Sequence, residues 1–262
     1  MPAALLSTRH GATMVLTLSH PERHNALGPD LWAAVVEALG VAESSAEVAT
    51  VVITGAGTLF SIGHDLDQLQ ASRREPASHQ VAQTEGLHNW IEAIRSFPKP
   101  VVAAVEGVAA DAGFALALAC DFIVAARSAQ FAMACGALGL SPDAGASWSL
   151  ARALPRQLAS ELLMLGTRLN AERLHALGVV NRLCGTGAAL GEALALAERL
   201  NARAPHALAS TKELLTEAET GSASLAGQLA RERDHFVTNL HHARTGAAIA
   251  AFREQRGAAP LA

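Results

Sequence analysis

The chain has 262 residues, of which 50% are hydrophobic and 17% are charged, so it can build a large buried core and is not intrinsically disordered. The formal net charge is −4, and the densest basic spot is the short run Ser72–Glu75. This charge balance argues against nucleic-acid binding, because a surface that binds nucleic acid needs clustered Lys and Arg.

The first two-thirds of the chain alternate predicted strands and helices. A strand is predicted at Met14–Leu18, followed by turn residues over Pro21–Asp30 and a helix at Leu31–Leu39. The β-branched run Ala49–Gly55 is typical of a strand that is covered on both faces. A loop of small residues leads from this strand into the segment Ser61–Leu69.

A second series of elements follows a polar segment. Ala71–Gln80 is polar and contains proline, so we expect a mobile loop there. The sequence then predicts a helix near Val81–Phe97, a buried strand at Pro100–Gly107 and a small-residue helix at Asp111–Cys120. Two short strands, "DFIVAA" and "AQFAMA", come next.

From Asp143 onward the pattern is mostly helical. The apolar residues that recur on one helical face near the C-terminus are Leu225, Leu229, Phe236 and Leu240. No segment resembles a flexible linker. We therefore expect an α/β core over residues 1–190 and a helical C-terminal region over residues 191–262.

The cysteines and the N-terminus indicate where the protein works. The three cysteines are widely spaced and form no C-x-x-C pair, so we expect neither a zinc site nor a disulfide framework. The N-terminus lacks a basic region followed by an apolar run, and no apolar stretch has membrane-spanning length. A cytoplasmic protein without a membrane partner is expected.

Two loop-to-helix junctions are candidates for a binding site. They are "SIGHDL" and "AADAGFA", and each follows a buried strand. Unpaired N–H groups at helix N-termini attract anions, so two junctions aimed at one point would form an oxyanion hole. The alternative is that Gly63 and Gly113 only permit tight turns, with Asp65 and Asp111 as helix caps.

These junctions belong to a longer set of ordered motifs: "HNAL", "SIGHDL", "VAAVEGVAADAGFALALACD", "AQFAMACGALGLSPDAGASW" and "AAFREQR". Together they resemble the crotonase (enoyl-CoA hydratase/isomerase) superfamily, from about Val15 to Arg256. The resemblance implies an α/β fold, a crotonase-like spiral of ββα units with C-terminal helices that help form a homotrimer or hexamer. It also implies an acyl-CoA thioester substrate, with coenzyme A as part of that substrate and no separate cofactor or metal.

The resemblance assigns roles by position. The thioester carbonyl is expected between two backbone N–H groups, those of His64 and Ala112, which would stabilise an enolate. The coenzyme is expected along the first two motifs. The residues that would flank it, or meet its adenine through their backbone, are Arg23, His24, Ala26, Ser61, Asp65 and Leu66.

Several departures from the family pattern bear on the chemistry. Hydratases of the family use two glutamates, whose positions are Ala115 and Cys135 here, so a standard hydratase is not expected. A buried Cys135 thiol should have a raised pKa and be a poor base. Asp111 and Ala112 stand where the family commonly has glycines. We expect the Asp111 carboxylate to cap the helix rather than face the enolate.

The stretch "GLSPDAGASW" places Asp143 among apolar and small residues. It resembles isomerases of the family, including those acting on ring-opened phenylacetyl-CoA intermediates, which use this aspartate to carry a proton between acyl carbons. The apolar surroundings should raise the pKa of Asp143 and make it a better proton carrier. The alternative is an N-cap for a helix at Ala144–Ala153.

Other functions remain open at this point. Family dehalogenases that act on 4-chlorobenzoyl-CoA use this aspartate as a nucleophile, with a histidine at a position similar to His88. Leu87 and Cys135 stand where tryptophans would be expected, so we favour a solvent-facing or core-edge His88. The remaining alternatives are a hydratase with atypical acids, a non-catalytic acyl-CoA binder and an RNA-binding protein.

Overall fold

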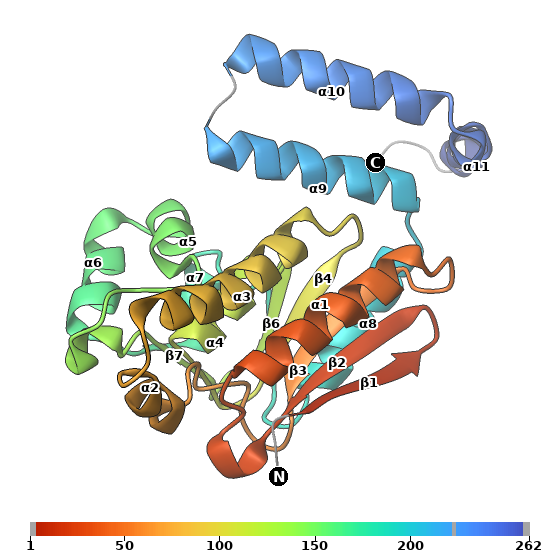
Figure 1. Ribbon diagram of the computed structural model, residues 1–262. Coiled ribbons are helices and arrows are strands. Elements are labelled where there is room, and N and C mark those ends of the chain that lie inside the picture. Colours follow the sequence, from red (N-terminus) through yellow and green to blue (C-terminus); the bar gives the residue numbers. More distant parts are fainter. Residues whose placement is uncertain (1–3, 222–223, 259–262) are drawn as a thin grey trace. The chain divides into compact units, whose positions relative to one another are not determined.

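The computed structural model describes residues 4–221 and 224–258 (Figure 1). The chain divides into two compact units, the first ending at Asn201 and the second beginning at Ala202. The boundary expected at residue 190 falls at the start of helix α8 (Ala189–Asn201), which the division places in the first unit. Helix α8 packs against strands of that unit.

The first unit is built on a six-stranded sheet with the order β1-β2-β3-β4-β6-β9. Its strands are β1 (Ala4–His10), β2 (Thr13–Ser19), β3 (Thr50–Gly55), β4 (Val101–Val105), β6 (Phe122–Ala126) and β9 (Arg182–Cys184). Strands β1 and β2 pair antiparallel, and the other neighbours pair parallel. β3 is buried along almost its whole length and β4 throughout, as expected for strands covered on both faces.

A smaller sheet has the order β5-β7-β8 and contains β5 (Val108–Ala110), β7 (Gln130–Ala132) and β8 (Leu169–Asn170). The chain passes from β4 in the large sheet to β5 in the small one and then into helix α4 (Ala112–Ala119). It next passes from β6 to β7 in the same way. Each repeat therefore gives one strand to each sheet, which is the ββα spiral expected from the resemblance.

Helices of varied length connect the repeats of the first unit. They are η1 (Pro21–Arg23), α1 (Pro29–Ser44), α2 (Leu66–Ser72), α3 (Ala77–Ser96), η2 (Cys135–Leu138), α5 (Ala146–Ala153), α6 (Arg156–Leu165) and α7 (Ala171–Ala176). The mobile loop predicted at Ala71–Gln80 is wrong, because only residues 73–76 separate α2 from α3. Pro76 precedes the first turn of α3, where its missing N–H costs no helical hydrogen bond, so this proline begins a helix.

The second unit consists of α9 (Pro205–Thr220), α10 (Leu225–Leu240) and α11 (Ala243–Ala258). Helices α9 and α10 pack together, and the Gln228 side chain donates to the Leu214 carbonyl at 3.1 Å. The apolar residues predicted on one helical face lie on α10 and are all exposed. None of the described helices has both the length and the apolar character needed to cross a membrane.

Asn25 ties two loops of the first unit together. It is 1% exposed and has a positive φ of 54°. Its Oδ1 accepts the His20 N–H at 2.9 Å, and its Nδ2 donates to the carbonyls of Ala56 at 2.8 Å and Leu59 at 3.0 Å. These bonds hold the segment after β2 against the segment after β3.

Ser61 extends this network toward the first loop-to-helix junction. Its buried hydroxyl donates to the Asn25 carbonyl at 2.7 Å and accepts the Gly63 N–H at 3.1 Å. Hydrogen bonds of the Asn25 and Ser61 side chains therefore fix the backbone conformation that leads into His64.

We expect Asn25→Ala to lower the free energy of unfolding by about 1–3 kcal/mol, because it leaves three part-buried partners of the amide unpaired. Urea unfolding measures the change. Asn25→Gly is the matched comparison, because glycine also lacks the amide but adopts positive φ without strain. It should be destabilised less than the alanine variant. An unfolding midpoint for Asn25→Ala equal to that of the wild type would contradict this role.

Candidate active site

The two loop-to-helix junctions lie against each other. A Cβ added to Gly63, where φ is +86°, would lie 2.8 Å from the Ala112 nitrogen. A Cβ added to Gly113 would lie 2.5 Å from the Ser61 carbonyl oxygen. Both distances are shorter than real Cβ contacts, so only glycine fits at either position. This approach places the residue after Gly63, His64, beside the start of helix α4.

His64 and Ala112 offer unpaired backbone donors. Among the described residues, neither the His64 N–H nor the Ala112 N–H donates to a backbone carbonyl. Ala112 is the first residue of α4, where an N–H has no acceptor within the helix. Both residues line one cavity of about 550 Å³. An oxygen atom that gains negative charge in this cavity could accept from both groups.

Asp143 lines the same cavity, with a side chain that is 28% exposed. Its Oδ1 lies 2.6 Å from Nε2 of His88, and its Oδ2 lies 3.1 Å from Nε2 of His64. The Ala144 N–H also donates to Oδ1. An ionised carboxylate can only accept hydrogen bonds, so each imidazole donates through Nε2 while Asp143 is charged.

These contacts set the charge of Asp143. Burial raises the pKa of its carboxyl, but the hydrogen bonds from His64, His88 and the Ala144 N–H outweigh burial and hold the pKa well below its usual range. The expected raised pKa is therefore wrong. The apolar neighbours that suggested it are adjacent in the sequence, whereas both histidines come from distant segments. Asp143 rests as a carboxylate, the form that can accept a proton.

Asp143 does not cap a helix. Helix α5 begins at Ala146 rather than Ala144, and its N-cap residue is Gly145, with φ of 75° and no side-chain cap. The two carboxylate oxygens of Asp143 are bonded to the histidines instead. The alternative interpretation of Asp143 as a helix N-cap is therefore wrong.

His88 lies on α3 with 46% of its side chain exposed, yet it also contacts Asp143. The expected exposure of His88 is confirmed, and the structure adds the contact with Asp143. Burial of Trp90 and Ile91 fixes which face of α3 meets the core. The sequence does not reveal that Asp143, which is distant along the chain, lies at the edge of this face.

Asp111 also lines the cavity that contains Asp143, and hydrogen bonds to the segment after β7 hold its carboxylate. It occupies the N-cap position of α4 with φ of 46°, but its side chain does not cap the helix. Its Oδ1 accepts the N–H groups of Ala134 at 2.7 Å and Cys135 at 3.0 Å. The expected side-chain cap is therefore wrong. Burial raises the pKa of Asp111, and it also raises that of the Cys135 thiol, as expected for a poor base.

A second cavity, of about 350 Å³, is lined by three of the predicted coenzyme contacts, Arg23, Ala26 and Asp65. Arg23 Nη1 lies 2.6 Å from Asp65 Oδ2 and 3.2 Å from Asp67 Oδ2. Asp65 also caps α2 by accepting the N–H groups of Asp67 and Gln68. Its predicted role as a helix cap is confirmed.

The other predicted coenzyme contacts are dispersed. Leu66 lines the cavity that contains Asp143. The Ser61 side chain is fully buried in the Asn25 network, and His24 is exposed with φ of 53°. The described residues contain no group of three or more His, Cys, Asp or Glu side chains arranged to hold a metal ion.

The family described as Enoyl-CoA hydratase/isomerase matches the chain over residues 8–259. The chain belongs to the enoyl-CoA hydratase/isomerase family. Members of this family act on acyl-CoA thioesters. The crotonase resemblance of the motifs is thereby confirmed, and so is the fold that it implied.

Several known members of the enoyl-CoA hydratase/isomerase family are similar to the chain. A 1,2-epoxyphenylacetyl-CoA isomerase of Escherichia coli is 36% identical over 232 residues, covering 88% of each protein. A 2,3-dehydroadipyl-CoA hydratase of the same organism is 31% identical over 252 residues, covering 96% of each. The crystal structure of an enoyl-CoA hydratase from Polaromonas sp. JS666 superposes with a TM-score of 0.94 at 60% identity, over 96% of this chain and 97% of that one.

We expect His88→Leu to raise the pKa of the Asp143 carboxyl toward its usual value. Removing a donor to the charged form destabilises that form, so the proton binds at higher pH. Carbon-13 NMR of the aspartate carboxyl groups measures the titration. His79→Leu, on the exposed surface of the same helix, is the matched control and should leave it unchanged. An Asp143 titration that is the same in His88→Leu and wild type would contradict the contact.

Proposed function

We propose that the protein is an enoyl-CoA isomerase that moves a double bond along the acyl chain, with Asp143 as the proton carrier. One observation carries the proposal: Asp143 is a carboxylate held ionised in the cavity that His64 and Ala112 also line. Ala115 and Cys135 stand where a hydratase of the family would have glutamates. The similarity to an isomerase of 1,2-epoxyphenylacetyl-CoA adds support.

The reaction needs one base and one place for negative charge. In a 3-enoyl thioester, the Asp143 carboxylate removes a proton from C2, and the electron pair moves onto the thioester oxygen. The His64 and Ala112 N–H groups donate to that oxygen. Protonated Asp143 then gives its proton to C4 as the electrons return, which leaves a 2-enoyl thioester and the original carboxylate.

The low pKa of Asp143 makes it a weak base, so the oxyanion donors must supply much of the stabilisation. One such donor is typically worth on the order of 3 kcal/mol in the transition state. The two histidines hold both carboxylate oxygens, so the group cannot rotate freely while it serves C2 and then C4. We expect the coenzyme portion to lie along the cavity lined by Arg23, Ala26 and Asp65.

A second candidate function is hydrolytic dehalogenation of an aryl-CoA, with Asp143 as nucleophile. The specific observation in its favour is the 2.6 Å contact between His88 Nε2 and Asp143 Oδ1, together with the depressed pKa of the carboxylate. A histidine in that place could activate the water that releases the product. Leu87 and Cys135, which are not aromatic, weigh against an aryl-binding wall.

We expect Asp143→Asn to slow conversion of trans-3-hexenoyl-CoA to the conjugated 2-enoyl product by about a hundredfold to ten-thousandfold, because the amide cannot accept the proton. Binding of a saturated acyl-CoA should persist. Crotonyl-CoA and 4-chlorobenzoyl-CoA serve as parallel substrates, scored by hydration and by chloride release. Isomerisation at the wild-type rate in the variant would overturn the proposal, and chloride release that depends on Asp143 would favour the second candidate.

A further inference from the structure

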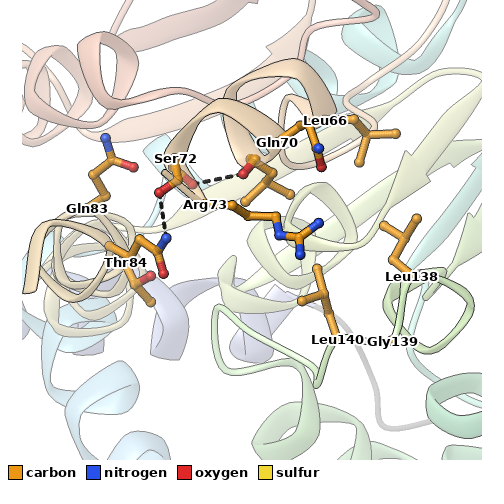
Figure 2. Close-up of a pocket in the computed structure, with 11 residues that line it drawn as sticks. Leu66, Gln70, Ser72, Arg73, Gln83, Thr84, Leu138, Gly139 and Leu140 are labelled. Atoms are coloured by element: carbon orange, nitrogen blue, oxygen red, sulfur yellow. Dashed lines mark hydrogen bonds between the residues drawn. The ribbon is translucent and has the colours of Figure 1, made fainter. Parts of the chain in front are cut away.

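A cavity of about 610 Å³ adjoins the one that contains Asp143 (Figure 2). The residues that line both cavities are Leu66, Leu69, Thr84, Leu138 and Leu140. Four of the five are leucines, so the passage between the cavities is mainly apolar. An acyl chain whose thioester lies at His64 can therefore continue through this passage as a run of methylene groups.

The residues that line this cavity but not its neighbour are more polar than the shared ones. Its lining includes Gln70, Ser72, Gln80 and Gln83, and Arg73 is the one charged residue among the described residues of the lining. Figure 2 shows the Arg73 side chain reaching from the end of α2 into the cavity, toward Leu138 and Leu140. The part of the chain that the structure describes contributes no carboxylate to this lining that could neutralise Arg73.

Helix α2 separates this arginine from the predicted coenzyme site. One face of α2 lines the cavity of Figure 2. The residues on this face, at helical spacing, are Leu66, Leu69, Gln70 and Arg73. Asp67, Gln68 and Ala71 lie on another face and line the cavity with Arg23. Arg73 therefore faces the acyl side of the helix rather than the side where the coenzyme is placed.

We propose that Arg73 binds a carboxylate at the far end of the acyl group, so that the preferred substrates are CoA thioesters of dicarboxylic acids. A guanidinium forms strong, charge-assisted hydrogen bonds with a carboxylate. The leucines between the two cavities suit the intervening methylene chain. This inference rests on the proposed function only for the position of the thioester end.

The test compares saturated thioesters that bind without reacting. Isothermal titration measures the affinity of hexanoyl-, octanoyl- and decanoyl-CoA against their dicarboxylic partners adipoyl-, suberoyl- and sebacoyl-CoA. At the best length, the wild type should bind the dicarboxylic thioester about tenfold more tightly, and added salt should reduce that preference. Arg73→Gln should lose the preference while binding the monocarboxylic thioesters normally.

Arg74→Gln is the matched control, because Arg74 is exposed like Arg73 but does not line the cavity. It should keep the preference. Equal wild-type affinities for the two thioesters at every length would overturn the proposal. So would an Arg73→Gln variant that weakens coenzyme A itself and all six thioesters alike, since Arg73 would then bind a coenzyme phosphate. These thioesters are not turned over, so the outcome is independent of whether the isomerase proposal holds.

Discussion

The close approach of two strand-to-helix turns is the constraint on which the candidate site depends. A side chain on Gly63 would strike the Ala112 nitrogen, and a side chain on Gly113 would strike the Ser61 carbonyl. Because each turn excludes a Cβ from the other, the residues His64 and Ala112 come to line one cavity. The ββα repeat makes this possible, since one turn follows β3 and the other follows β5, and Ser61 forms a parallel bridge with Ala109.

His64 couples the two halves of the proposed chemistry. Its backbone N–H is the expected donor to the enolate oxygen, and its side chain contacts Asp143. A single residue thus fixes the distance between the base and the site of developing charge. His88 holds the other carboxylate oxygen from α3, and the Ala144 N–H adds a third donor. The consequence is a carboxylate that is fixed in place and ionised, at the cost of basicity.

How much the sequence predicts depends on whether the decisive contacts are local. The β-branched run Ala49–Gly55 and the small-residue helix at Asp111–Cys120 are found close to where pattern and composition place them. Asp65 caps α2 because capping is a local interaction. The pKa of Asp143, by contrast, depends on His64 and His88, and no periodicity brings these three residues together. The Asp111 carboxylate likewise bonds to a segment beyond β7, so its conformation could not be inferred from its position before a helix.

In the proposed reaction, the Asp143 carboxylate itself carries the proton from C2 to C4. The most direct measurement uses 3-hexenoyl-CoA deuterated at C2, in ordinary water, with the product analysed by NMR. We expect the wild type to place part of the deuterium at C4, because the same carboxyl accepts and returns it, and Asp143→Asn to do so at a rate lower by orders of magnitude. Transfer of deuterium to C4 by Asp143→Asn at the wild-type rate would contradict a proton-carrying role for Asp143.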